Sequence, residues 1–100
     1  DRDYGEFDVR KANKRQKVGA LQIQLTKADE KRQKYTIELV SDDKMTEKKD
    51  KTAFEPVQFY QQGFRMPTEI VVQQVSKDRI TGYVSAPKIR DAQTTATIKN

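Results

Sequence analysis

The chain contains no cysteine, no histidine and no tryptophan among its 100 residues. Without cysteine it can form no disulfide, no zinc–thiolate site and no thiol nucleophile. Without histidine it lacks the usual general base near neutral pH, and serine–histidine catalysis and histidine metal sites are excluded. Its four glycines are isolated from one another, so no glycine-rich phosphate-binding loop can be built. We therefore expect a protein that is not an enzyme and that uses no cofactor and no metal.

Long apolar runs are also missing. Hydrophobic residues make up 34% of the chain and charged residues 35%, and no run approaches the roughly 18 residues that a transmembrane helix needs. The length supports one domain with a compact core. The chain begins with Asp1 rather than methionine, so we expect that an upstream segment such as a leader peptide was removed. This favours an exported protein, periplasmic or extracellular.

Strict alternation of apolar and polar residues is the clearest signal in the sequence. A period of two indicates strands with one buried face, and it appears twice between residues 18 and 41. Closing the two strands over Asp29, Glu30 and Lys31 makes one face apolar and the other polar. A slip of one residue would mix the two faces, so the register is well specified. The predicted apolar pairs are Leu21 with Leu39, Ile23 with Ile37, and Leu25 with Tyr35.

A second hairpin is predicted from residues 68 to 84, with its turn at Lys77 and Asp78. The expected register sets Val75 opposite Ile80, Val71 opposite Val84, and Gln73 opposite Gly82. Apolar residues then fall on both faces, which is typical of a central or strongly coiled hairpin. Gly82 is the residue expected to mark a bulge or a bend.

The remaining segments are shorter or more polar. A first strand is indicated by alternation around Phe7 and Val9, and a further strand is expected after Pro56, which lacks an N–H. Residues 10–17 are predicted to form a basic loop, and residues 42–53 a charged loop or an exposed edge strand. Lysine-rich edges resist strand-to-strand aggregation, which suits the latter segment. Residues 88–100 are predicted to be a mobile tail or a late edge strand.

These segments together predict an all-β fold. We expect a single β domain over residues 1–87, built as a small antiparallel β-sandwich or barrel of about six or seven strands. The general plan is similar to immunoglobulin-like and transthyretin-like sandwiches. A similarity of layout carries no function by itself.

Basic side chains are the main candidates for a binding site. The net charge is +5, and two segments concentrate positive charge that would attract phosphates, anionic glycans or acidic lipids. A strand of about ten residues between them, at ~3.3 Å each, would place the segments roughly 30 Å apart at opposite ends of the domain. Solvated loops are therefore the alternative interpretation. The candidate anion-binding residues are Arg10, Lys11, Lys14, Arg15, Lys17, Lys31, Arg32 and Lys34.

Two functions fit this chemistry. The first is a non-enzymatic interaction or accessory module, whose protein partner binds at a strand edge or through loops. The candidate edges are residues 44–48 and 94–98. The second is a small basic barrel that binds nucleic acid, with the basic residues on phosphates and Tyr60 or Tyr83 stacking on bases. The oligomeric state is left open.

Overall fold

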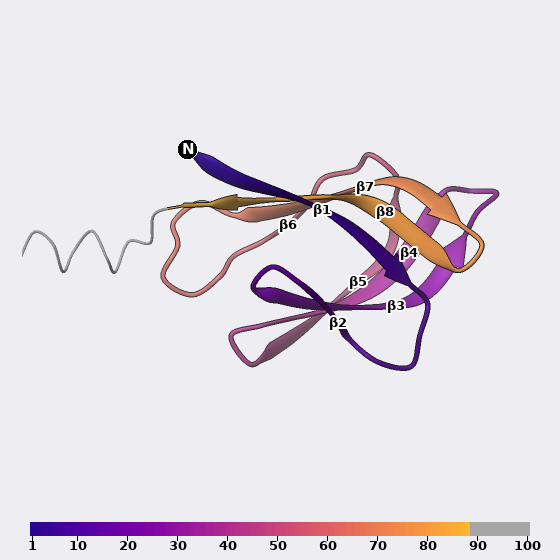
Figure 1. The fold of residues 1–100 in the computed structure, drawn as a ribbon, viewed down its shortest axis with the longest axis horizontal. Coiled ribbons are helices and arrows are strands. Elements are labelled where there is room, and N and C mark those ends of the chain that lie inside the picture. Colours follow the sequence, from indigo (N-terminus) through magenta and orange to yellow (C-terminus); the bar gives the residue numbers. More distant parts are fainter. Residues whose placement is uncertain (89–100) are drawn as a thin grey trace, which may run out of the picture.

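Eight antiparallel strands form two sheets in the computed structural model, which describes residues 1–88 (Figure 1). One sheet has the strand order β1-β8-β7-β6, and the other has the order β2-β3-β4-β5. The predicted all-β class is confirmed, with eight strands in place of six or seven. The strands are β1 Arg2–Arg10, β2 Gln16–Val18, β3 Leu21–Asp29, β4 Lys34–Ser41, β5 Lys44–Thr52, β6 Val57–Phe59, β7 Thr68–Ser76 and β8 Arg79–Pro87.

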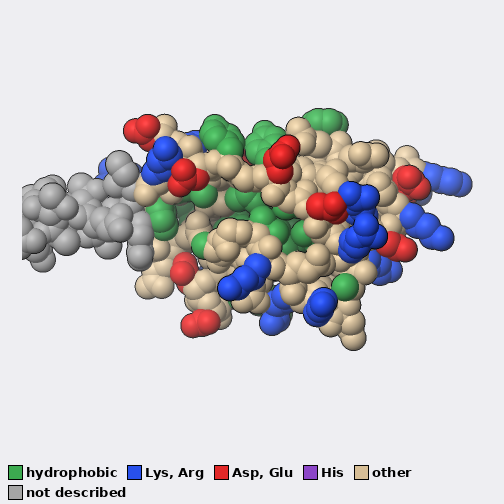
Figure 2. Space-filling view, in the orientation of Figure 1, with side chains coloured by type: hydrophobic (Ala, Val, Ile, Leu, Met, Phe, Trp, Pro, Cys, Tyr) green, Lys and Arg blue, Asp and Glu red, His purple; other side chains and the backbone are tan. Residues whose placement is uncertain are grey.

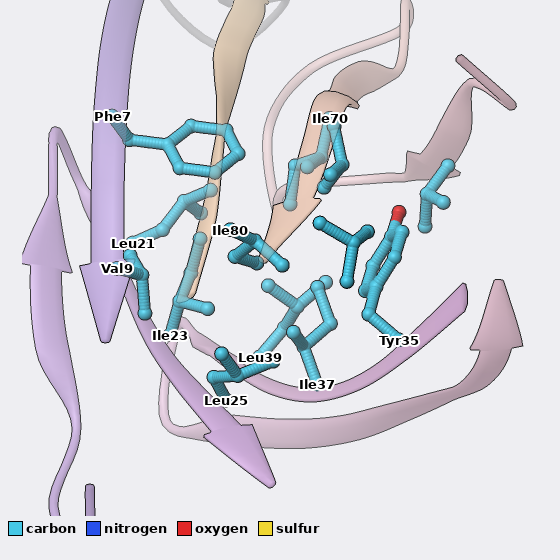
Figure 3. Packing of buried hydrophobic residues seen from close by; sticks show 13 residues of the cluster. Phe7, Val9, Leu21, Ile23, Leu25, Tyr35, Ile37, Leu39, Ile70 and Ile80 are labelled. Carbon is cyan, nitrogen blue, oxygen red and sulfur yellow. The ribbon is translucent and has the colours of Figure 1, made fainter. Parts of the chain in front are cut away.

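The two sheets pack face to face over a single apolar core. Charged side chains are scattered among polar and apolar ones on the face seen in Figure 2, and the alternating residues of β3 and β4 meet those of β1, β7 and β8 between the sheets (Figure 3). Ile23, Leu25 and Ile37 are completely buried, as are Ile70 and Ile80. Each such side chain contributes about 1.5–3 kcal/mol when it leaves water, so this core is the main source of stability.

The β3–β4 hairpin has the predicted buried face but a different register. Ile23 lies opposite Leu39 and Leu25 opposite Ile37, two residues away from the predicted pairs. The turn comprises residues 30–33, where Gln33 has a left-handed φ of 54°, and a bulge between Leu25 and Lys27 absorbs one residue of β3. The predicted pairs are therefore wrong, but a slip of two residues keeps every side chain on its own face.

The β7–β8 hairpin contains a bulge that explains its two apolar faces. Val75 lies opposite Ile80 as predicted, but beyond the bulge Val72 lies opposite Gly82, so the predicted Gln73–Gly82 pair is wrong. The extra residue reverses the alternation, and Ile70, Val72 and Val75 all reach the core.

The bulge also changes the pairing nearer the ends of this hairpin. Ile70 lies opposite Val84 and Val71 opposite Tyr83, in place of the predicted Val71–Val84 pair. The expectation that Gly82 marks this irregularity is confirmed, because a Cβ at Gly82 would lie 2.0 Å from the carbonyl oxygen of Val71.

The two polar segments have different outcomes: residues 10–17 are only partly a loop, and residues 42–53 contain the predicted edge strand. Residues 12–15 form a loop as predicted for residues 10–17, but Arg10 ends β1, Lys11 forms a parallel bridge with Leu25, and Gln16 begins β2. Residues 42–53 contain the edge strand β5 after a tight turn at Asp42 and Asp43, whose φ angles are 53° and 62°. Aspartate tolerates this left-handed conformation, which a two-residue hairpin loop of type I′ requires at both positions. The predicted edge at residues 94–98 lies outside the described residues.

Candidate functional site

The basic residues singled out from the sequence are divided between two regions. The Lys11 N–H donates to the Asp78 carbonyl (2.7 Å), and the Gln33 side chain bonds to the backbone of Val75, so the β3–β4 and β7–β8 turns lie at one end. The expected separation of 30 Å is wrong for Lys11, because its partner Leu25 is only four residues, about 13 Å, from the end of β3. The residues brought toward this end are Arg10, Lys11, Lys31, Arg32 and Lys34.

The other three basic residues lie apart from this end. Lys17 is opposite Gln22 near the start of β3, and the Arg15 guanidinium lies 3.6 Å from the sulfur of Met45 at the start of β5. Lys14 is exposed in the connection between β1 and β2. The eight residues therefore do not form one patch.

Acidic side chains alternate with the basic ones at the shared end (Figure 2). Asp8 accepts two hydrogen bonds from Arg79, at 2.7 and 2.5 Å, and these bonds hold the pKa of the Asp8 carboxyl below its usual range. Asp29 lies 3.9 Å from Arg32 across the adjacent turn. Paired charges of opposite sign weaken the attraction of this end for a polyanion.

Strand edges are the second class of candidate, and the β7 edge is covered. β6 pairs only with residues 68–70 of β7, so no strand in the described part of the chain pairs with the remaining residues on that side of β7. The Phe54 N–H donates to the Val72 carbonyl at 2.7 Å. The Gln33 amide then donates to the Val75 carbonyl and accepts from the Val75 N–H, at 2.7 and 2.9 Å. A partner strand would find these groups occupied.

The β5 edge, predicted around residues 44–48, is an edge strand with several protective features. Lys44, Lys48 and Lys51 lie opposite inward-facing residues of β4, and Lys48 donates to the Gln58 carbonyl at 3.1 Å. A register shift opposite Thr36 also interrupts the strand. Inward-pointing lysines and irregularities are the means by which edges avoid pairing with another chain.

The β1 edge has none of these features. Its nine residues pair with β8 without a register shift and contain no proline. The Lys11–Asp78 hydrogen bond continues the same register and fixes the phase of the ladder. Hydrogen-bonded and non-hydrogen-bonded pairs alternate in an antiparallel ladder. The N–H and C=O groups of Tyr4, Glu6, Asp8 and Arg10 therefore point away from β8. The Arg10 carbonyl accepts a hydrogen bond from the Gln16 side chain at 2.7 Å, so the free part of the edge is at Tyr4, Glu6 and Asp8.

A groove of about 480 Å³ lies beside this edge, between β1 and β2. The two strands belong to different sheets, and they diverge toward the N-terminus (Figure 1). Gly5 shares the inward face of Phe7 and Val9 but is exposed, and a Cβ at Gly5 would meet nothing within 4 Å. The apolar side chains that line the groove include Phe7, Val9, Val18, Leu21, Val84 and Ala86.

Tyr60, which is exposed, and Tyr83, which is half-buried, do not combine into a stacking surface. Tyr83 lies on the outer face of β8 beside Tyr4, with ring centroids 6.3 Å apart and planes inclined by 50°. Tyr60 follows β6 and borders a different groove, between β5 and β6, together with Lys44 and Lys48. The two tyrosines expected to stack on bases therefore belong to separate surfaces.

Alternation in the sequence predicts a strand around Phe7 and Val9 but does not identify β1 as a binding edge. The one available signal was Gly5, a small residue at a position where the alternation through Phe7 and Val9 calls for an apolar side chain. Whether a strand lies at an edge depends on its neighbours, and these were not known from the sequence.

Comparisons of the chain with protein-family models, with curated proteins and with solved structures found no significant match. In the part of the chain that the structure describes, no helix is long and apolar enough to cross a membrane. Across the same residues, no three acidic side chains gather in a way that could hold a metal ion.

Proposed function

We propose that this domain is a non-enzymatic interaction module that binds an extended segment of a protein partner along the free edge of β1. The observation that carries the proposal is the row of outward-pointing backbone groups at Tyr4, Glu6 and Asp8, which no neighbouring strand among the described residues uses. An added strand would satisfy these groups by main-chain hydrogen bonds, each worth about 0.5–1.5 kcal/mol net.

Contrast with the other edges supports β1 as the binding edge. The lysines of β5 and the capped groups of β7 oppose the addition of a strand, whereas β1 has a regular backbone beside an apolar groove. An edge of this kind is otherwise a hazard for aggregation, so its retention favours a specific partner. Export of the protein stays a prediction.

The nucleic-acid alternative has less support, because its basic residues are divided and partly paired with acids. A fluorescent single-stranded oligonucleotide titrated at two salt concentrations tests it directly. Tight binding that weakens steeply with salt would favour this alternative, and absence of binding at low salt would remove it.

The decisive experiment removes one outward N–H from β1. Seven-residue peptides that bind the domain would be selected from a random display library, and their affinities compared for the native chain, Glu6→Pro and Glu6→Ala. Proline removes the outward N–H but leaves the β8 ladder in place, whereas alanine removes only the side chain.

We expect Glu6→Pro to weaken binding about tenfold and Glu6→Ala to change it little, because one main-chain hydrogen bond is lost only in the first. Circular dichroism melting would verify that both variants are folded. Equal affinity of folded Glu6→Pro and Glu6→Ala for every selected peptide would refute binding along β1.

A further inference from the structure

We infer, on the basis of the function proposed above, that the partner segment lies between β1 and β2 and directs a large apolar side chain into the groove at Gly5. The partner is thus a basic polypeptide segment in extended conformation, with apolar residues at alternate positions. This inference concerns the selectivity of the site, whereas the proposed function concerns only its use of the β1 edge.

The spacing of the two sheets suits one inserted strand. β1 and β2 are edge strands of facing sheets and do not pair with each other, although the Gln16 side chain at the start of β2 donates to the Arg10 carbonyl at the end of β1 (2.7 Å). Facing sheets pack about 10 Å apart, and two steps of a strand ladder, at about 4.8 Å each, span the same distance. A single strand placed midway would therefore reach both edges and close this side of the sandwich. Residues Asp3 to Val9 line the groove, so the contact covers about seven residues of β1.

Gly5 provides the space for an anchoring side chain. Glycine inside a strand lowers stability and is usually found where the backbone requires it or where another group approaches closely. The φ of Gly5 is not positive, so its backbone conformation does not require glycine. Because a Cβ there meets nothing within 4 Å, the missing side chain leaves room beside Phe7, Val18 and Val84. The volume of the groove falls within the range of ligand-binding pockets, about 300–1,000 Å³.

The charges beside the groove indicate the polar character of the partner. The lining residues of β1 include Asp3, Glu6 and Asp8, whereas β2 contributes only Lys17. Asp8 is paired with Arg79, and Asp3 lies 3.8 Å from Lys88, so Glu6 is the acid of these three that forms no ion pair among the described residues. A strand added beside β1 places its outward side chains next to Glu6, where lysine or arginine forms a favourable cross-strand pair.

A peptide series tests the anchor separately from the edge. The probe is the acetylated and amidated peptide Lys-Val-Thr-Phe-Lys-Val-Thr, compared with versions that carry leucine, alanine or glycine in place of phenylalanine. A scrambled peptide with contiguous apolar residues controls for composition. Affinity would be measured by fluorescence anisotropy, and the site would be located by hydrogen exchange of the backbone amides observed by NMR.

We expect the phenylalanine peptide to bind at least about tenfold more tightly than the glycine peptide, because a buried apolar side chain contributes that much. The amides of Glu6 and Asp8 should exchange more slowly when the peptide is bound. The variant Gly5→Leu should fill the groove and reduce the preference for phenylalanine to about twofold or less. Because a Cβ at this position meets nothing within 4 Å and the groove lies beside it, the variant should melt near the native temperature.

The outcomes separate this inference from the proposed function. If Glu6 and Asp8 are protected equally by all four peptides, the anchor is refuted and the β1 edge stands. If the peptides leave these amides unprotected and the selected library peptides bind Glu6→Pro as well as Glu6→Ala, both proposals fail.

Two other occupants of the groove give distinct results. A dimer in light scattering that dissociates in Glu6→Pro would mean that a second copy of the chain fills the groove. Protection of the Glu6 and Asp8 amides in the peptide-free monomer would mean that the chain's own residues 89–100 fill it. Either result would overturn the inference of a separate basic partner.

Discussion

At the scale of single residues, Tyr35 is buried and only 1% exposed. Its hydroxyl has no hydrogen-bond partner among the described residues. Burial, with a smaller effect of Glu55, raises the pKa of this phenol. We predict that Tyr35→Phe increases the free energy of unfolding by about 1 kcal/mol at pH 7, because it removes an unsatisfied polar group. Urea unfolding measures the change.

The same residue predicts a dependence on alkaline pH. The unfolded chain loses the Tyr35 proton near pH 10 while the native state retains it, so a rise in pH above 10 favours unfolding. The stability advantage of Tyr35→Phe should therefore grow by up to about 1.4 kcal/mol between pH 10 and pH 11. Tyr60→Phe, at an exposed ring, is the control and should match the native chain. A native chain more stable than Tyr35→Phe at both pH values would contradict this account.

At the scale of elements, the β7–β8 hairpin depends on the absence of a side chain at Gly82. Because a Cβ there would collide with the backbone of Val71, Gly82→Ala should force the strands apart and cost about 3 kcal/mol or more. Gly5→Ala on the neighbouring strand meets open space and should change stability by no more than about 0.5 kcal/mol. Thermal and urea unfolding of the two variants would check this. A similar loss of stability in both would show that the collision with the Val71 backbone is not the cause.

At the scale of the whole molecule, Gln33 joins the two sheets. Its side chain bonds to both backbone groups of Val75, and the Ala53 N–H donates to its carbonyl at 2.9 Å. Gln33→Ala leaves the Val75 groups without a protein partner and should reduce stability by about 2 kcal/mol. Gln74→Ala, at an exposed position of β7, should have almost no effect. A loss below about 0.5 kcal/mol for Gln33→Ala would mean that water replaces the amide.

The sequence by itself determined the class of fold and most of the core. Alternation is a property of one strand, so the buried faces of β3 and β4 could be identified without knowing any partner. The turn at Asp42 and Asp43 likewise follows from local backbone preferences.

Only the tertiary structure decided the registers, the bulges and the edges. The bulge in β7 and the turn that ends in Gln33 are parts of a contact between two sheets, and no local pattern encodes such a contact. β1 has a free edge because β8 pairs with one side of β1 and no strand within residues 1–88 pairs with the other side. Lys11 reaches the β7–β8 turn because the chain crosses between the sheets after β1. Side-chain period is fixed within a strand, whereas hydrogen-bond partners and solvent exposure depend on residues far away in the chain.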